Sequence, residues 1–217
     1  MPEKLALFPL SLVVFPDERL NLHVFEPRYR DLLADVQNEG ITFGVPTFLN
    51  GNIMPIGTEV RLTKVEQTFP TGESDIRTRG VRRFRLHEFF PRLDEKAYGG
   101  GSVTFLETDL AEDLDLNRQI VAQVRELYRL LEVDKDIQDA AAGFSIFDIA
   151  HHIGLSLADE YRLLSTESAQ DRQLFILDHL KSLEPRIQQK SRLRDRALMN
   201  GHFKNVIPPR VDKGMKD

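Results

Sequence analysis

One short stretch of the sequence changes its hydrophobic period from that of a strand to that of a helix. From Leu20 to Val24 apolar and polar residues alternate, which is typical of a half-buried strand. After Glu26 the apolar residues instead follow the spacing of one helix face, at Tyr29, Leu32, Leu33 and Val36. Pro27 suits the first turn of a helix, and Gly40 is a typical C-terminal stop. The sequence therefore predicts a strand that runs directly into a helix ending near Gly40.

The residues before this stretch are apolar but are interrupted by prolines. Pro9 lies within the segment 5–10 and Pro16 directly follows the segment 12–15, and neither proline can donate a ladder hydrogen bond inside a central strand. We therefore expect the two segments to form the bent edge of a sheet. Their apolar character also suggests a signal peptide, but the prolines and the polar residues at 17–19 favour a folded strand pair.

Further strands are predicted between residues 41 and 106. Asn50-Gly51 is a strong hairpin signal, and it precedes a long strand over 57–69 whose inward face switches near Thr63. Such a switch requires a bulge or a bend, as strands make at the corners of small barrels. With additional strands near 76–86 and 102–106, the pattern predicts a closed or nearly closed β-barrel of about six strands with one inserted helix.

Beyond residue 110 the hydrophobic period is helical. An amphipathic helix is predicted over about 115–132, and three capping-box patterns begin further helices at Ser145, Ser156 and Ser168. A kink or a restart is expected at Pro185. The predicted fold class is thus α+β. Its three parts are the β-rich half 1–110, an all-helical bundle 111–200 and a basic C-terminal tail 201–217.

Composition narrows the classes of protein further. The 217 residues include no cysteine, which excludes disulfides, a thiolate nucleophile and a cysteine-ligated zinc, and which suits the reducing cytoplasm where we expect the protein to be. No apolar run approaches the roughly 18 residues needed to cross a bilayer, so no membrane partner is expected. The formal net charge is −5, yet residues 190–217 carry eight Lys or Arg against three Asp. We expect this basic end to fold back on an acidic surface of its own or of a neighbouring subunit.

Several motifs together resemble one known family. FPLSLVVFP and LNLHVFEPRYRDLL are similar to the opening of the Lon-protease N-terminal substrate-binding domain, especially in its stand-alone bacterial relatives, and GTEV and GVRRFRL resemble later strands of that family. The resemblance implies a PUA-like β-barrel joined to a helical bundle. Asp17 is a departure, because relatives usually have glycine there. The motif residues, which we assign to structure, are Pro9, Phe15, Pro16, Phe25, Glu26, Arg28, Tyr29, Gly57, Gly80 and Arg83.

Within the helical part of this motif, two side-chain roles are expected. Glu26 should pair with Arg30, four residues further along the helix, and Tyr29 should face the barrel.

No catalytic site is predicted. Full-length Lon proteases owe their activity to an ATPase module and a Ser-Lys peptidase domain, and this chain has no G-x-x-x-x-G-K-[ST] phosphate loop. The glycine-rich segment 99–102 lacks the lysine of such a loop. His151 and His152 are neighbours on a predicted helix, about 100° apart around it, so they cannot hold one metal ion together. We expect no catalytic residue, no metal and no cofactor, with a hydrolase of unrecognised site kept as a third alternative.

The resemblance implies a non-enzymatic module that recognises polypeptides. The candidate contacts are apolar side chains at predicted turns and strand ends, namely Phe69, Pro70, Phe89, Phe90 and Pro91. A groove between barrel and bundle is a further candidate. The expected partners are unfolded or partly folded polypeptides, with a protease or a chaperone as additional candidates.

An RNA-binding PUA-like module is the main alternative. The hairpin near residues 77–85 carries five arginines that could grip an RNA backbone, namely Arg77, Arg79, Arg82, Arg83 and Arg85. The pattern also fits a solvated strand face balanced by Glu73, Asp75 and Glu88, and we favour that interpretation. The segment 144–164 has the pattern of a helix-turn-helix, but Asp159 and Glu160 would repel phosphates, so nucleic acid is not the favoured partner.

Overall fold

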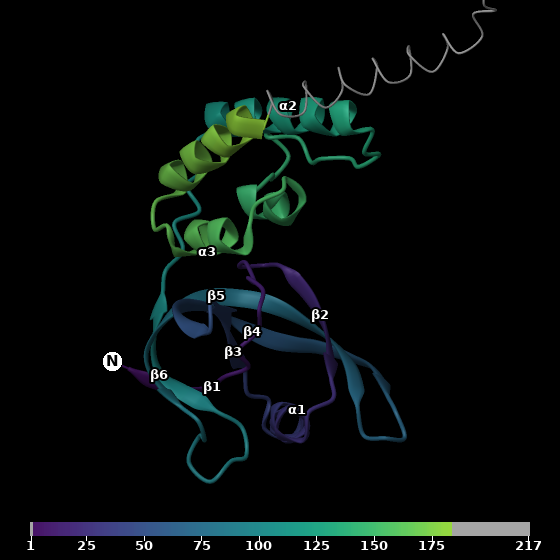
Figure 1. Cartoon of the computed structure of the whole chain (residues 1–217), viewed down its shortest axis with the longest axis vertical. Helices are drawn as coiled ribbons and strands as arrows, with labels where there is room; N and C mark the ends of the chain where they lie inside the picture. The colour runs from purple at the N-terminus through teal and green to yellow at the C-terminus, as the bar shows by residue number, and fades with distance from the viewer. Residues whose placement is uncertain (1, 184–217) are drawn as a thin grey trace, which may run out of the picture.

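The computed structural model describes residues 2–183, in which a curved β-sheet lies against a cluster of helices (Figure 1). The elements in chain order are β1 (Glu3–Ala6), β2 (Arg19–Val24), α1 (Pro27–Glu39), β3 (Phe43–Leu49), β4 (Asn52–Thr68), β5 (Ser74–Phe90), β6 (Gly100–Leu106), α2 (Leu114–Leu131), the short 3-10 turns η1 (Ile146–Asp148) and η2 (Ala150–His152), and α3 (Leu157–Ser165). A further helix covers residues 169–183, where the described part of the chain ends.

The six strands form one antiparallel sheet in the order β1-β6-β5-β4-β3, with β2 paired to the first half of β5. Strands β4 and β5 are 17 residues each, and both bend through the whole sheet half (Figure 1). The register between them shifts between Leu62 and Lys64. This irregularity confirms the predicted switch of the inward face near Thr63, because a bulge turns the following side chains to the other side.

Of the predicted closed or nearly closed barrel, full closure is wrong, since within residues 2–183 no strand ladder joins the two ends of the six-stranded sheet. The chain after β1 reaches β3 only through two isolated bridges, Leu7 with Gly44 and Leu10 with Thr47. Pro9 lies between these bridges and has no N–H to donate, so it interrupts the ladder that would have closed the barrel. The predicted edge segment 5–10 is therefore regular strand only as far as Ala6.

The predicted passage from strand to helix is confirmed. Helix α1 begins at Pro27 and ends at Glu39. Its C-cap is Gly40, whose φ of 68° is left-handed and whose N–H donates to the Val36 carbonyl at 3.1 Å. The predicted pair of Glu26 with Arg30 is wrong: Glu26 contacts Arg28 at 2.8 Å, while Arg30 donates to the Thr71 carbonyl. Glu26 is the N-cap, with an extended backbone, so its side chain does not lie on the helix face that carries Arg30.

Two turns behave as their residue types require. Asn50 and Gly51 both have positive φ, 52° and 81°, as the hairpin between β3 and β4 demands. Asp17 also has a positive φ of 62°. Its backbone N–H donates to the Gly80 carbonyl at 3.2 Å, which holds the strained turn against β5.

The two halves have separate hydrophobic cores that meet at the first strands. In the sheet half, α1 packs Tyr29 and Leu32 against Val60 and Ile76 of the sheet. In the helical half, α2 and α3 surround Ile146 and Ile153, and Phe15 of the sheet half joins this second core. The Phe15 ring stacks on that of Phe147 at 5.0 Å, so apolar packing continues across the boundary.

The predicted helical bundle is present in part. Helix α2 begins at the N-cap Asp113, and Ser156 caps α3 as expected. The capping box at Ser145 is also present, but it begins a short 3-10 turn rather than a long helix, so His151 and His152 lie on turns too. Pro185 and the basic tail lie outside the described residues.

Candidate functional site

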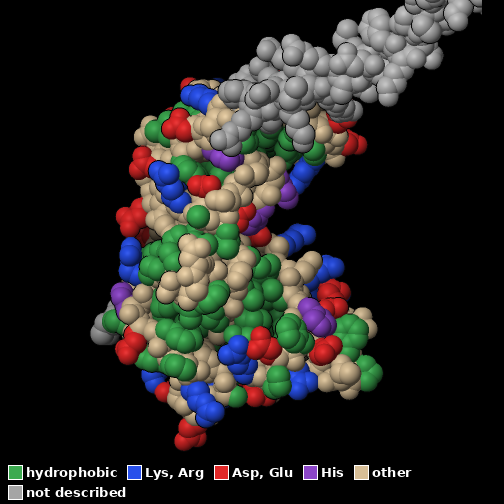
Figure 2. All heavy atoms as spheres, in the orientation of Figure 1, with side chains coloured by type: hydrophobic (Ala, Val, Ile, Leu, Met, Phe, Trp, Pro, Cys, Tyr) green, Lys and Arg blue, Asp and Glu red, His purple; other side chains and the backbone are tan. Residues whose placement is uncertain are grey.

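An apolar groove of about 480 Å³ opens on the sheet half. Four segments of the chain form it: the residues after β1, the start of α1, the β3–β4 hairpin, and the end of β5 with the loop that follows. Its lining residues are Leu7, Pro9, Leu10, Ser11, Arg28, Tyr29, Phe48, Ile53, Phe89, Pro91 and Gly99. Figure 2 shows hydrophobic side chains gathered in a broad area over this half of the molecule.

The groove has a rigid floor and exposed aromatic sides. Tyr29 is buried and stacks on Phe8 with ring centroids 3.8 Å apart, and burial raises the pKa of its hydroxyl. Phe48 and Phe89 are 39% and 37% exposed, so each keeps part of its ring open to solvent. Arg28 is the charged group of the lining, and it is paired with Glu26. Exposed rings beside a packed floor can bury an incoming apolar side chain with little rearrangement.

The structure brings some of the sequence-predicted contact residues together and separates others. Phe89 and Pro91 line the groove, whereas Phe90 is half-buried and does not line it. Phe69 lies beside His23 at the opposite end of β5, and Pro70 follows it in the turn. The five predicted residues therefore belong to two places, not one.

Phe69 belongs to a small aromatic cluster with Phe25. The His23 ring lies 6.0 Å from the Phe25 ring and 5.9 Å from the Phe69 ring, and Phe25 is 57% exposed. His23 also contacts Asp75 at 2.7 Å, and that contact, together with Glu73, raises the pKa of the imidazole.

The groove also contains residues that the sequence did not single out. Leu10, Phe48 and Ile53 line it together with the motif residues Pro9, Arg28 and Tyr29. Phe48 stands two residues before the Asn50-Gly51 turn, so an aromatic residue next to a hairpin signal was the available clue. The other lining residues come together because particular strand ends meet in the fold, and the hydrophobic periodicity of the sequence does not predict which strand ends meet.

Other motif residues lie at close approaches of the chain, or at the boundary between the sheet half and the helical half. A Cβ at Gly80 would lie 2.2 Å from the Phe15 carbonyl oxygen, so the strand approaches the chain closely at this point. A Cβ at Gly57 would lie 2.5 Å from the Phe84 ring. Phe15 and Pro16 are both buried where the sheet meets the helices.

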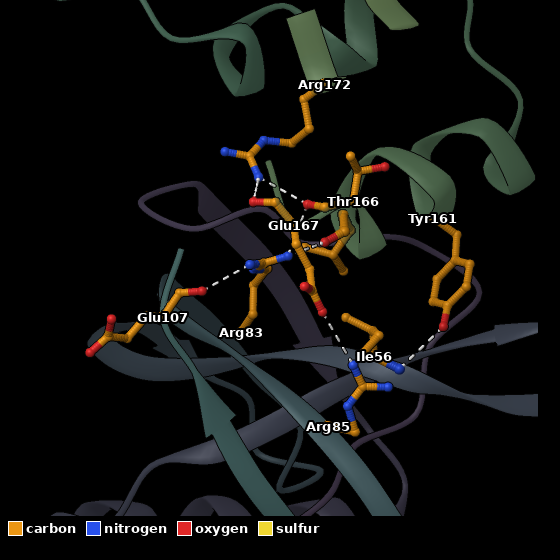
Figure 3. Close-up of polar contacts among 9 residues, drawn as sticks. Ile56, Arg83, Arg85, Glu107, Tyr161, Thr166, Glu167 and Arg172 are labelled. Atoms are coloured by element: carbon orange, nitrogen blue, oxygen red, sulfur yellow. Dashed lines mark hydrogen bonds and ion pairs between the residues drawn. The ribbon is translucent and has the colours of Figure 1, made fainter. Parts of the chain in front are cut away.

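Arg83 connects the two halves, as Figure 3 shows. Arg83 as a whole is 2% exposed, and its guanidinium donates to the carbonyl oxygens of Leu164 at 3.0 Å, Thr166 at 3.1 Å and Glu107 at 2.9 Å. Burial lowers its pKa below the usual arginine value. The expectation that Arg83 lies on a solvated strand face is therefore wrong, because the loop after α3 covers it.

A second buried arginine holds the same loop from the helical side. Arg172 is fully buried and donates to the carbonyls of Thr166 at 2.9 Å and Glu167 at 2.8 Å (Figure 3). Arg83 and Arg172 thus share the Thr166 carbonyl. Around them, Tyr161 accepts a hydrogen bond from the Ile56 N–H at 3.2 Å, which adds another contact between α3 and β4.

His151 makes a further link across the boundary. Its Nε2 lies 3.2 Å from a Glu18 carboxylate oxygen of the sheet half, and its Nδ1 lies 2.8 Å from Glu160 of α3. Hydrogen bonding to Glu18, and then to Glu160, raises the pKa of His151 to about 9 despite burial. The ring is consequently a cation at neutral pH, held between two carboxylates.

A pocket of about 330 Å³ lies between the halves, where Figure 2 shows the molecule narrowing. Pro16 and Phe147 contribute apolar surface to it. Its polar members are already engaged with one another: Glu112 accepts hydrogen bonds from Asn117 at 2.9 Å and from Ser145 at 3.1 Å. This pocket is therefore less suited to an apolar ligand than the groove on the sheet half.

The five arginines of the RNA alternative do not form one surface. Arg77 contacts Glu66 at 2.8 Å, Arg79 contacts Asp17 at 3.2 Å, and Arg82 contacts Glu59 at 2.6 Å. Arg85 lies 3.6 Å from Glu167, and Arg83 is buried in the joint. Each is thus already paired within the chain, and no observation favours a continuous RNA-binding face over these five.

Among residues 2–183, no three His, Asp or Glu side chains form a group that could hold a metal ion. None of the helices found in this same range is long and apolar enough to cross a membrane.

The fold and the groove define a class of protein: an α+β domain in which an open antiparallel sheet carries an apolar surface groove and a helical half. The chain belongs to the family described as the ATP-dependent protease La (LON) substrate-binding domain, whose sequence model matches residues 4–182. Comparison with curated proteins gives no match.

Two solved structures are similar to this chain over most of its length. A Lon N-terminal domain protein from Xanthomonas campestris is 31% identical with a TM-score of 0.63, over 81% of this chain and 98% of that one. The N-terminal domain of a Mycobacterium avium complex Lon protease is 15% identical with a TM-score of 0.64, over 82% of this chain and 98% of that one. The second likeness concerns the fold alone.

Proposed function

We propose that this chain is a non-enzymatic recognition module that holds apolar side chains of unfolded or partly folded polypeptides in the groove on the sheet half. The observation that carries the proposal is the pair of partly exposed rings, Phe48 and Phe89, on the lining of a groove of about 480 Å³. The family's description as a substrate-binding domain supports it.

The energetics of such a groove suit weak binding of many sequences. Burying one large apolar side chain contributes about 1.5 to 3 kcal/mol before the cost of ordering the ligand is subtracted. Arg28 is the charged lining residue and is already paired with Glu26, so little in the lining selects one polar sequence over another. A filter or an adaptor for unfolded chains fits these properties, with a protease or a chaperone as the partner that receives them.

Two further parts of the proposal come from the sequence. We place the protein in the cytoplasm, which suits a chain without cysteine. We also treat residues 1–110 and 111–200 as the two structural units, with 201–217 as a separate basic tail.

The test compares two aromatic sites on the same sheet half. Fluorescence anisotropy would measure the binding of labelled, unfolded casein to the full chain, to the double variant Phe48→Ala/Phe89→Ala and to the control Phe25→Ala/Phe69→Ala. The control removes two rings from the cluster at the other end of β5. We expect the groove variant to bind about tenfold more weakly, which corresponds to about 1.4 kcal/mol, and the control to bind as the parent does.

Thermal unfolding followed by circular dichroism would show that both variants remain folded. Loss of binding in the control alone would contradict the groove and place the contact at the Phe25 and Phe69 cluster. Parent-like binding by both variants would contradict the proposal as a whole.

A further inference from the structure

The outer face of strands β2, β5 and β4 carries an unusual row of arginines. These three strands lie side by side beyond α1 (Figure 1), and their register places Arg19 opposite Arg79 and Arg79 opposite Arg61. Directly opposite residues of antiparallel strands share a face, so the three side chains form one line across the sheet. All three are exposed.

A second row on the same face repeats the pattern. Two residues along β5, Arg77 lies opposite Asn21 of β2 and Lys64 of β4. A concave site of about 370 Å³ opens on this face. It is lined by Arg19, Thr63, Lys64, Arg77, Thr78 and Arg79.

Few carboxylates neutralise these cations. Lys64 and Arg77 share Glu66, at 2.9 and 2.8 Å, and the hydrogen bond from Lys64 lowers the Glu66 pKa. Arg79 contacts Asp17 at 3.2 Å. Within residues 2–183, neither Arg19 nor Arg61 has a carboxylate within ion-pair distance. We call Arg19, Arg61, Lys64, Arg77 and Arg79 the basic face.

Folding alone does not explain this arrangement. Like charges directly opposite each other in a sheet are destabilising, and the basic face has two such pairs in its first row and one in its second. The inner face of the same strands supplies the core through Val24, Ile76 and partly buried leucines. Packing of the core therefore does not require a cationic side chain at any position of the basic face.

We propose that the basic face binds a short acidic segment of a partner polypeptide, one that presents two or three carboxylates. Strand spacing makes the first row about 10 Å wide, and the second row lies about 7 Å from it. Carboxylates on alternate residues of an extended peptide are about 7 Å apart, which matches the distance between the rows. The binding energy comes from direct ion pairs and from relieving the repulsion of Arg79 with Arg19 and Arg61, which lack carboxylate partners.

The limits of the basic face favour a short segment over a nucleic acid. Along the strands, the next row toward the β4–β5 hairpin contains His23 opposite Asp75, with Glu73 close by. At the other end Asp17 adjoins Arg79. A nucleic acid strand carries a phosphate every few ångströms and would extend past both ends onto these carboxylates, where it is repelled.

This surface is separate from the apolar groove, since the two share no lining residue. The inference therefore goes beyond the proposed function, and either one can fail without the other. Together, the two surfaces would suit a partner segment that has an acidic stretch and an apolar stretch at different points of its sequence.

The experiment measures binding of the full chain to a labelled peptide in which glutamate alternates with serine, and to its glutamine counterpart. Fluorescence anisotropy at about 0.05 M and 0.5 M salt separates the electrostatic part of the affinity. The variant is Arg19→Glu/Arg61→Glu, which places carboxylates on both sides of Arg79 and so keeps the sheet stable. The control is Lys135→Glu/Lys181→Glu, an equal change of charge at exposed positions of the helical half.

We expect the glutamate peptide to bind, the glutamine peptide not to bind, and the Arg19→Glu/Arg61→Glu variant to lose at least about tenfold in affinity while the control stays within about twofold. Equal loss in variant and control would mean that net charge alone attracts the peptide and would overturn the proposal. So would equal binding of the two peptides or no binding at all. A labelled single-stranded oligonucleotide that binds more tightly than the glutamate peptide would overturn it in favour of nucleic acid.

Discussion

Replacing Arg83 with methionine tests whether the joint between the two halves depends on a buried cation. The guanidinium donates to the carbonyls of Leu164, Thr166 and Glu107, and its Nε donates to the Thr108 hydroxyl at 3.2 Å. Methionine follows the arginine side chain about as far as Nε, and it has no donor. The substitution therefore keeps the packing of the aliphatic stem and removes the guanidinium end with its hydrogen bonds.

The expected cost follows from the acceptors that remain. The Thr166 carbonyl keeps its bond from Arg172, whereas the Leu164 carbonyl loses its guanidinium donor in a buried setting. An unsatisfied buried acceptor costs about 1 to 3 kcal/mol, and a hydrogen bond from a charged donor contributes about 1.5 to 3 kcal/mol. Methionine also avoids the desolvation of a guanidinium, which offsets part of this loss. We expect the free energy of unfolding to fall by about 3 kcal/mol.

Urea unfolding followed by far-UV circular dichroism would measure this change, because the chain has no tryptophan for fluorescence. The matched control is Arg85→Met, two residues along the same strand. Arg85 is 46% exposed and lies 3.6 Å from Glu167, which is 79% exposed, so its loss should cost less than about 1 kcal/mol. A destabilisation below about 1 kcal/mol for Arg83→Met, equal to that of the control, would refute the role assigned to the buried guanidinium.

Two further predictions concern single residues. The pKa of His151 is raised from its ordinary 6.5 to about 9, so its contribution to stability is complete below pH 6.5 and is lost as the pH rises through 9. Because the ring is still 29% exposed, we expect a reduced effect: between pH 7 and pH 10 the free energy of unfolding should fall by about 2 kcal/mol more in the parent than in His151→Gln. If urea unfolding gave the same pH dependence for both proteins, this prediction would be contradicted. Asp17→Gly should relieve the positive φ of 62° and raise the free energy of unfolding by about 0.5 kcal/mol, since its exposed ion pair with Arg79 contributes little; a lower thermal midpoint would be the opposite result.

Local elements were predictable because their signals are local. The change of period at Glu26, with Pro27 and Gly40 at the two ends, is sufficient to place helix α1. Asn50-Gly51 specifies a turn because asparagine and glycine tolerate positive φ. The parity switch near Thr63 gave the position of the bulge between Leu62 and Lys64. Each of these depends on a few neighbouring residues.

Two of the failures concern which surfaces come together. Alternation along β5 shows that Arg83 and Phe84 point to opposite faces, but only the packing of the loop after α3 makes both of them buried. The barrel stays open because the chain after β1 pairs with β3 through isolated bridges on either side of Pro9 and not through a continuous ladder. This pairing depends on the path that the chain takes after β1. Periodicity within one strand contains neither fact.

For the apolar groove and the basic face, too, single residues were predictable from the sequence but their neighbours from other strands were not. Phe89 and Pro91 were found as strand-end residues, but their neighbour Phe48 comes from another hairpin. The row of Arg19, Arg79 and Arg61 exists only because the register aligns three strands, so counting arginines along β5 alone grouped residues that face different ways.

The carbonyl that Arg83 and Arg172 share has a consequence for how the chain responds to acid. Neither a guanidinium nor an amide oxygen gains or loses a proton in the range where carboxylates are neutralised. The Thr166 junction is therefore unaffected by acidification, unlike joints built from Asp and Glu with Lys. Protonation of Glu18 and Glu160 in acid would therefore weaken the link through His151, while the hydrogen bonds at the Thr166 carbonyl would remain.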